Sequence, residues 1–399
     1  MSRYLFVVPP MAGHVNPTLA VGRELAARGH AVAWTGPDDV VGPLLPGDAT
    51  FLPTPLAPAV RAAIAARADD LRGVAALKHL VGDFLVPLAE CMVPGVRAAV
   101  DAFAPDALVV DQQALAGLAV ACTSGLPWAT SASTSANLDD PLAAVPKVKA
   151  WADGLQRDVL RSAGVAKPTA ATVDLRASPH LVLVFSTPAL VGAAHVADHV
   201  AFVGPSIADR PAEPPFDLGW VDHEGPHVLV SLGTLNWHNG GRFFAAAAEA
   251  LGDLGARGVI AAPPDVVGPV PAGVVATAPV PQLALMPHLD AVVCHGGHNT
   301  VCEALAHGLP LVVAPIRDDQ PTIAEQVVRA GAGVRVMFRR VTPAGLRAAV
   351  AAALDDPGLR AGARRIQRSF AEAGGAAAAA DRLERLPARP GATVHPAEV

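Results

Sequence analysis

The segment that decides the fold spans residues 291–303 and reads AVVCHGGHNTVCE. Its first four residues are apolar and of strand length. The glycine pair 296–297 follows, and it lets the backbone turn sharply and approach a ligand closely. We expect a helix to begin at Asn299 or Thr300 and to end before Gly308. A strand, a glycine turn and a helix N-terminus together favour an anion site, because free N–H groups and the helix dipole point at the turn.

A second polar group follows the next apolar run. Residues 311–314 are expected to form a buried strand, and Asp318, Asp319 and Gln320 fall in the loop after it. The carboxyl ends of parallel strands meet at one edge of a sheet, so the anion site and these polar side chains share that edge. Open α/β sheets bind their ligands there.

The start of the chain shows the same plan. Residues 4–8 and 31–35 are expected to be buried strands, joined by a loop over residues 9–15 and a helix over residues 16–28. Pro17 would then occupy the first helical position, where proline is favoured. Two strands with a helical crossover imply a parallel sheet.

His14 and Asp111 each follow a predicted strand. Residues 107–110 read as a strand that ends at Asp111, with a helix over residues 115–124 and a strand over residues 128–131 after it. Doubly wound topology can bring two such strand ends together. An imidazole with a carboxylate on its second nitrogen is suited to general-base catalysis. The alternative is that Asp111 only caps the following helix.

The other elements complete two α/β halves. Further strands are expected at residues 181–185, 200–203, 227–231, 259–262 and 334–337, and residues 44–58 read as proline-rich loops. Further helices are expected at residues 60–71, 74–85, 241–255, 322–330, 343–354, 358–373 and 376–386, with residues 136–175 largely helical. The predicted layout is a first domain over residues 1–205, a linker over 206–226, a second domain over 227–386 and a disordered tail over 387–399.

Composition narrows the class of protein. The chain has 399 residues, 52% of them apolar, which is enough for two α/β cores. A net charge of −6 without a basic block argues against nucleic-acid binding. The four cysteines form no CxxC pair and suit a reducing compartment. We recognise no signal peptide and no membrane-spanning stretch, and expect a cytoplasmic protein.

Residues 280–320 resemble the nucleotide-sugar signature of the family 1 glycosyltransferases, which include enzymes that act on macrolides and other natural products. The resemblance is carried by Pro281, Gln282, His295, Gly297, Glu303, Asp319 and Gln320. The segment GHVNP at residues 13–17 is similar to the start of the same family. This resemblance implies the GT-B fold, in which two Rossmann-like, doubly wound parallel-sheet domains face each other across a cleft. A last helix that crosses back to the first domain is also typical of it.

The resemblance implies roles for these residues. Pro281 and Gln282 would contact the base of the donor, His295 the diphosphate and Glu303 the ribose, while Asp319 and Gln320 would hold the sugar. The turn at residues 231–234 resembles the second diphosphate loop. The expected donor-binding residues are Ser231, Gly233, Thr234, Pro281, Gln282, His295, Gly297, Asn299, Thr300, Glu303, Asp319 and Gln320.

The family's chemistry places a base at His14, with Asp111 as its orienting partner. We expect a single in-line displacement that inverts the anomeric centre, with the diphosphate stabilised by backbone amides and His295. No metal and no cofactor beyond the nucleotide sugar is then required. A UDP-hexose is favoured as donor, with a dTDP-sugar as the other choice.

The acceptor is expected to be an apolar small molecule. Met11, Phe84, Leu138 and Trp151 are the expected acceptor-binding residues, because few charges stand near them. We expect no nucleic-acid partner, no membrane span, and a monomer or a homodimer.

Several alternatives stay open at this stage. Cys294, His295, His298 and Cys302 together resemble the ligand set of a zinc site, although they would not converge. Thr300 and Glu303 have the spacing of a capping box. Asp319 and Gln320 could simply begin the helix at Pro321.

Three other functions fit this fold class. A non-catalytic binding or activator protein is one, but the presence of both His14 and Asp111 disfavours it. A lipid-linked cell-wall glycosyltransferase is another, but residues 9–13 lack its glycine-rich run. A sugar-nucleotide epimerase is the third.

Overall fold

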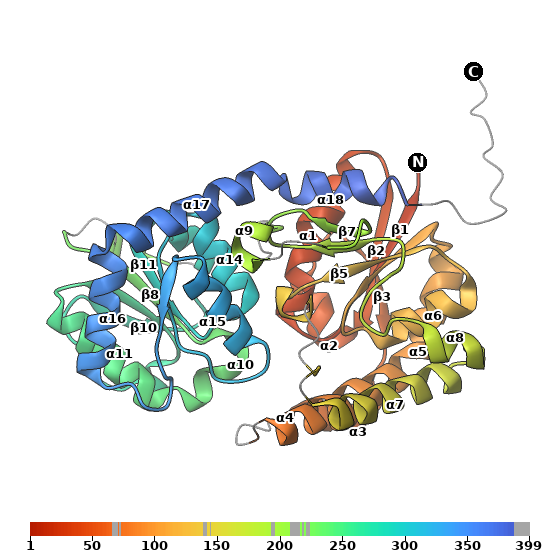
Figure 1. The fold of residues 1–399 in the computed structure, drawn as a ribbon, viewed down its shortest axis with the longest axis horizontal. Helices are drawn as coiled ribbons and strands as arrows, with labels where there is room; N and C mark the ends of the chain where they lie inside the picture. Colours follow the sequence, from red (N-terminus) through yellow and green to blue (C-terminus); the bar gives the residue numbers. More distant parts are fainter. Residues whose placement is uncertain are drawn as a thin grey trace.

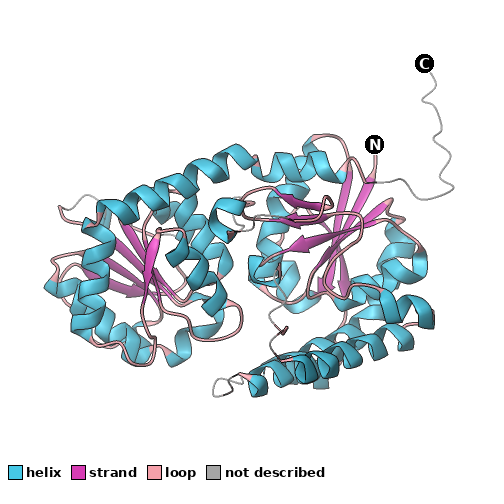
Figure 2. Ribbon diagram, viewed as in Figure 1, coloured by secondary structure: helices cyan, strands magenta, loops and turns pink. Residues whose placement is uncertain are grey.

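The computed structural model describes residues 1–65, 71, 73–138, 142–143, 145–192, 196–207, 216–217, 219–220 and 224–386. The predicted tail over residues 387–399 and much of the predicted linker over residues 206–226 lie outside the described residues. Two parallel β-sheets form the centres of two α/β units, with helices on both faces of each sheet (Figure 1, Figure 2).

The first sheet has the strand order β3-β2-β1-β4-β5-β6-β7. Its strands are β1 (Arg3–Val7), β2 (Ala31–Pro37), β3 (Thr50–Thr54), β4 (Ala107–Asp111), β5 (Trp128–Ala132), β6 (Val182–Val184) and β7 (Val200–Phe202). The helices of this unit are α1 (Ala12–Ala27), α2 (Asp38–Val41), α3 (Pro58–Ala65), α4 (Val74–Lys78), α5 (Val86–Phe103), α6 (Leu115–Ser124), α7 (Pro146–Ser162), α8 (Lys167–Thr172) and α9 (Pro188–Val191).

The second sheet has the order β10-β9-β8-β11-β12-β13. Its strands are β8 (His227–Ser231), β9 (Arg257–Ala261), β10 (Val274–Thr277), β11 (Ala291–Cys294), β12 (Leu311–Val313) and β13 (Gly333–Arg335). Its helices are α10 (Gly233–Asn236), α11 (Gly241–Asp253), α12 (Pro264–Val267), α13 (Gln282–Leu285), α14 (His298–Ala306), α15 (Gln320–Arg329), α16 (Pro343–Asp355) and α17 (Pro357–Ala373), followed by α18 (Gly375–Leu383).

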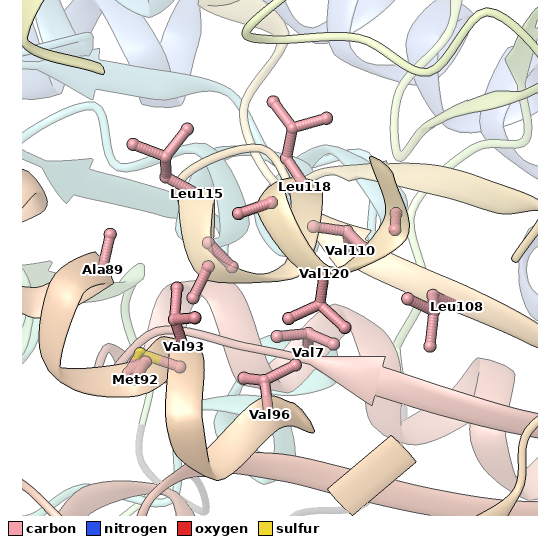
Figure 3. Close-up of a cluster of buried hydrophobic side chains, with 14 of the residues drawn as sticks. Val7, Ala89, Met92, Val93, Val96, Leu108, Val110, Leu115, Leu118 and Val120 are labelled. Atoms are coloured by element: carbon pink, nitrogen blue, oxygen red, sulfur yellow. The ribbon is translucent and has the colours of Figure 1, made fainter. Parts of the chain in front are cut away.

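Both faces of the first sheet are covered because its central strands are apolar throughout. Successive side chains of a strand point to opposite faces. Val7 and Val110 therefore pack with α5 and α6 on one face, as Figure 3 shows. Phe6 and Val109 pack with α1 and α18 on the other face. Strands buried on both faces are typical of parallel sheets.

The last helix, α18, returns to the first unit and lies along α1 (Figure 1). Ala379, Ala380 and Leu383 are buried there with the side chains of α1. Arg28 donates to Asp381 at 2.6 Å and to Glu384 at 3.1 Å. These ion pairs are partly exposed and contribute little each, so the apolar contact is the main attachment.

The predicted start of the first helix is wrong. α1 begins at Ala12 after Met11, which is extended, and Pro17 lies inside the helix. The amides of His14 and Val15 both bond to the Met11 carbonyl, so the first turn forms before the proline. His14 is therefore a helical residue and not part of a loop.

Two edge strands were missed. β3 lies within residues 44–58, which were expected to be loops, and β10 lies between proline-rich segments. Pro53 is tolerated in β3 because an edge strand needs to pair on one side only. Elsewhere most predicted elements were found within two residues of their expected bounds, and α6 and β8 match residue for residue.

The predicted helix over residues 74–85 is longer than expected. α4, the π-helical segment η2 (His79–Leu85) and α5 form one run from Val74 to Phe103. By length and composition alone this run could cross a membrane, a test that the core helix of a soluble protein also passes, so the absence of a membrane span stays a prediction. Leu88, Met92 and Val96 of α5 are buried against the first sheet, as in the core helix of a globular unit.

Two helical glycines should respond oppositely to alanine. A Cβ at Gly362 in α17 would collide with the Gly331 carbonyl, whereas one at Gly154 in α7 meets nothing within 4 Å. We expect Gly362→Ala to destabilise the fold by about 1–3 kcal/mol. Gly154→Ala should stabilise it by about 0.5–1 kcal/mol, because alanine is the better helix former. Thermal unfolding midpoints of both variants test this; a Gly362→Ala midpoint at or above the wild-type value would contradict it.

Candidate active site

His14 and Asp111 are brought together by the pairing of β1 with β4. Val7 lies beside Val110 in that pair, so the two strands end at the same level. His14 is in the first turn of α1, and Asp111 is the last residue of β4. The distance from His14 Nδ1 to Asp111 Oδ1 is 2.8 Å. The expected pair is thus within hydrogen-bond distance.

Asp111 does not cap the helix after it. α6 begins at Leu115 behind Ala114, and Asp111 instead accepts a second hydrogen bond from the Gln113 amide at 2.8 Å. Its side chain is buried. An ionised carboxylate can only accept, so Nδ1 of His14 carries the proton and Nε2 keeps its lone pair. That tautomer is the one a base requires.

Ser133 is a third member of this group, and the sequence-based prediction missed it. Its hydroxyl lies 2.7 Å from His14 Nδ1, and Gln112 Nε2 donates to it at 3.4 Å. β5 lies next to β4, and Ser133 follows its end. The hydroxyl-rich run at residues 130–135, directly after a predicted strand, was the signal that could have pointed to it.

The charge of Asp111 decides the protonation of His14. Burial acts to lower the pKa of His14, but the Asp111 charge and its hydrogen bond outweigh it and leave the pKa raised above 6.5. The charge of Asp319, which belongs to the second unit, adds to the increase. The site is therefore built electrostatically from both units.

In the second unit, two glycine turns meet around His295. β8 and β11 are neighbours, and Ser231 pairs with Cys294, so the turns after them lie side by side. A Cβ at Gly233 would lie 2.7 Å from the His295 ring, and one at Gly297 would lie 2.6 Å from it. Both positions therefore need glycine. Burial lowers the pKa of His295 to about 4, so its ring is neutral near pH 7.

The helix after this turn begins earlier than expected. α14 starts at His298 with Gly297 as its N-cap, so Thr300 is its third residue and not its cap. The capping-box alternative for Thr300 and Glu303 is therefore wrong. Glu303 instead accepts a hydrogen bond from Gln282 Nε2 at 2.5 Å, and the same nitrogen lies 3.3 Å from Thr300 Oγ1. Three expected donor-binding residues thus lie together.

Asp319 and Gln320 have separate tasks at the start of α15. Gln320 is the first helical residue, not a loop residue, and its Oε1 accepts from the amides of Ile316 and Arg317 at 2.9 and 3.1 Å. Asp319 stands at the N-cap but makes no side-chain capping bond. Its charge acts on His14 and His295. The start-of-helix alternative therefore explains Gln320 better than Asp319.

A small, partly open cavity lies between the two units. It contains Asn299 and Glu303 from the expected donor set, and its full lining is Asn16, Pro17, Leu19, Phe185, Pro205, Ser206, Ile207, Leu283, His298, Asn299, Cys302 and Glu303. From sequence, His298 was considered only as a member of the zinc alternative. It is buried in the contact between units, where its Nε2 lies 3.2 Å from the Phe185 carbonyl oxygen.

The expected acceptor-binding residues do not line this cavity. Met11 is the N-cap of α1, one turn from His14. Phe84 and Leu138 pack partly buried against two different apolar clusters. Trp151 packs near Gly82 and lies 5.9 Å from Lys78 Nζ. Phe84 and Trp151 thus come from elements that pack on each other, η2 and α7, whereas Leu138 packs in a different apolar cluster.

The zinc alternative finds no converging ligand set. Cys302 Sγ lies 3.5 Å from His298 Nε2, but Cys294 is buried within β11 in the core. In the part of the chain that the structure describes, no three histidine, cysteine, aspartate or glutamate side chains are arranged to hold a metal ion.

Comparisons with known proteins show which class of protein this chain is similar to. Residues 248–386 match the family described as erythromycin biosynthesis protein CIII-like, C-terminal domain. The chain is 29% identical to 4′-demethylrebeccamycin synthase of Lentzea aerocolonigenes, over 96% of this chain and 99% of the relative. It is also 29% identical to demethyllactenocin mycarosyltransferase of Streptomyces fradiae, over 97% of this chain and 87% of that one.

Solved structures give the same class. The glycosyltransferase of kitacinnamycin has a TM-score of 0.78 and 28% identity, over 97% of this chain and 99% of that chain. A calicheamicin glycosyltransferase has a TM-score of 0.77 and 25% identity, over 96% and 98%. The fold is thus the two-domain GT-B fold, and the protein is a glycosyltransferase. These matches support a bacterial family 1 glycosyltransferase of the natural-product type.

The protonation of His14 gives a direct test of the site. Asp111→Asn removes the charge that raises the pKa of His14 and leaves burial, which lowers it. We expect the pKa of His14 to lie above 6.5 in the wild type and to fall in the variant. Titration of ring signals by NMR measures both values. His295, whose pKa is lowered to about 4 by burial, is the internal control and should not move. An unchanged His14 pKa would contradict the pairing.

Proposed function

We propose that this glycosyltransferase moves a hexose from a nucleoside diphosphate sugar to a hydroxyl group of an apolar natural product, with inversion and without a metal. The observation that carries the proposal is the 2.8 Å contact between His14 and Asp111. It lies at the edge of the first sheet, where Asn299 of the second unit donates to Gly13 at 3.0 Å. The base and the glycine turns thus belong to one site.

His14 removes the proton from the acceptor. A neutral alcohol attacks an anomeric carbon weakly, so Nε2 takes the hydroxyl proton as the carbon–oxygen bond forms and the bond to the diphosphate breaks. Attack opposite to the leaving group inverts the anomeric centre. Asp111 stabilises the imidazolium that results. Positioned base catalysis of this kind is worth about 10²- to 10⁴-fold.

The leaving diphosphate is stabilised by the turns of the second unit. The first turn of α14 presents free backbone N–H groups and the positive end of the helix dipole. The neutral His295 ring lies between Gly233 and Gly297, where the two glycine turns meet. These groups are set before the reaction and therefore cost little reorganisation. The proposed mechanism needs no metal step.

The donor is proposed to be a UDP-hexose. Glu303 and Gln282 form one hydrogen-bonded pair next to the interdomain cavity, and a carboxylate there suits the two hydroxyls of a ribose. The carboxylate of Asp319 makes no side-chain capping bond to α15, so its oxygens can accept hydrogen bonds from the hydroxyls of a sugar. A relative from Bacillus subtilis is named an uncharacterized UDP-glucosyltransferase, whereas a Streptomyces glycosyltransferase was solved with thymidine diphosphate. The nucleoside is therefore the part that most needs a test.

The acceptor is proposed to be an apolar small molecule. Relatives named 4′-demethylrebeccamycin synthase and demethyllactenocin mycarosyltransferase support this class. Of the four expected acceptor-binding residues, Phe84 and Leu138 pack in different apolar clusters, so these side chains give no shape for the acceptor.

Loss of the base should abolish transfer but not donor binding. We expect His14→Ala to lower kcat by about 10²- to 10⁴-fold while the Kd of UDP stays within about two-fold. In the wild type, the rate should fall as the pH is lowered through the pKa of His14, because a base must be neutral. The midpoint of this fall should lie above pH 6.5, because the pKa of His14 is raised. Acceptor turnover and calorimetric UDP binding measure these effects. Full transfer by His14→Ala would refute the proposed mechanism.

The ribose contact can be tested with two donors that carry the same sugar. UDP-glucose has a ribose 2′-hydroxyl, and dTDP-glucose lacks it. We expect Glu303→Ala to raise the KM of UDP-glucose about ten-fold or more and that of dTDP-glucose clearly less, because one charge-assisted hydrogen bond is lost. For each donor, the KM of the variant is compared with the KM of the wild type. The effect of the thymine methyl group is present in both values and therefore cancels. An equal loss for both donors would contradict the ribose role of Glu303.

A further inference from the structure

Pro17 leaves a backbone acceptor free beside His14. In an α-helix the carbonyl of residue 13 accepts from the N–H of residue 17. Pro17 lies inside α1 and has no N–H, so this bond cannot form. The Gly13 carbonyl, directly before His14 in the chain, therefore needs another donor.

That donor comes from the other unit. Asn299 Nδ2 donates to the Gly13 carbonyl at 3.0 Å. Asn299 is the second residue of α14 and follows the glycine turn around His295. One side chain thus ties the first turn of α14, where we place the diphosphate, to the first turn of α1, which carries His14.

The first turn of α1 has few restraints beyond the Met11 carbonyl, which accepts from the amides of His14 and Val15. Its N-cap, Met11, makes no side-chain capping bond, and no acidic residue stands in the turn. The exposed Gly13 adds no packing of its own. His14 itself is held through Nδ1 by Asp111 and Ser133, but these bonds act on the ring and not on the backbone. The hydrogen bond from Asn299 to the Gly13 carbonyl therefore affects the position of the backbone that carries the His14 ring.

We propose that Asn299 is a positioning residue for His14: through the carbonyl that Pro17 leaves free, it sets the base in register with the donor-binding turn. The inference rests on the proposed role of His14 as the base. A donor that occupies the first turn of α14 would hold the same turn from which Asn299 reaches Gly13. Donor binding then affects the orientation of His14, and the orientation of His14 affects donor binding by the same free energy.

The proposal separates two effects of Asn299. Its loss should weaken donor binding, because it belongs to the donor-binding turn, and should also lower kcat, because His14 loses its position. Only the second effect passes through Gly13. Pro17→Ala supplies the missing N–H, which bonds Gly13 within the helix and makes the tie from Asn299 dispensable.

A double-mutant cycle tests this separation at saturating donor. We expect Asn299→Ala to raise the donor KM and to lower kcat about five-fold, the size of one neutral hydrogen bond. In the Pro17→Ala background the same change should still raise the donor KM but leave kcat within about two-fold. An Asn299→Ala loss in kcat that is the same in both backgrounds would overturn the proposal.

Pro205→Ala is the matched control. Pro205 lines the same interdomain cavity as Pro17, but its nitrogen is not part of α1. In the Pro205→Ala background, Asn299→Ala should lower kcat as it does in the wild type. If Pro205→Ala also removes the effect, the cause is the cavity wall and not the Gly13 carbonyl, and the proposal fails.

Hydrogen exchange gives a readout that does not depend on catalysis. Without donor, Asn299→Leu should accelerate amide exchange in the first turn of α1 several-fold relative to the wild type, because leucine has similar size but no donor group. In the Pro17→Ala background the acceleration should vanish. Unchanged exchange in Asn299→Leu overturns the inference even if Pro17→Ala does not fold. Accelerated exchange in a protein whose His14→Ala variant remains fully active would instead refute the role of His14 as base.

Discussion

The pairing of β1 with β4 is the interaction on which the site depends. The strand order reverses at this pair, since β2 and β3 lie to one side and β5 to β7 to the other. Connections that leave such a point run in opposite directions and leave a crevice at the carboxyl ends of the strands. His14 and Asp111, 97 residues apart in the chain, meet in that crevice. A different neighbour for β1 would separate the base from its carboxylate.

The second sheet repeats this arrangement at the pair β8 and β11. The order again reverses there, and the turns that begin at Ser231 and His295 lie side by side. The two crevices have different chemistry. One buries a carboxylate that raises the pKa of a histidine, and the other buries His295 so that desolvation lowers its pKa to about 4. In the first crevice, the raised pKa makes His14 a stronger base. In the second, neutral backbone N–H groups suit the leaving diphosphate.

Agreement between prediction and structure depended on how local the signal was. α6 was predicted residue for residue, because an apolar run followed by Gly125 in the left-handed conformation specifies both its length and its end. The start of α1 was wrong, because the preference of proline for a first turn is statistical, and a hydrogen-bond donor from another unit can compensate for the N–H that an internal proline lacks. The start of α14 was wrong because Gly297 took the N-cap position that the polar residues after it were expected to fill.

The sequence by itself determined the alternation of strands and helices, the two glycine turns, the candidates for base and carboxylate, and through them the class of enzyme. These features are encoded within short segments, where periodicity and glycine placement act. Only the tertiary structure decided that Ser133 shares the Nδ1 atom of His14, that His298 is buried between the units, and that Asn299 reaches Gly13. Each of these contacts joins residues more than 100 positions apart. They follow from strand order and from the packing of one unit on the other, which local preferences do not specify.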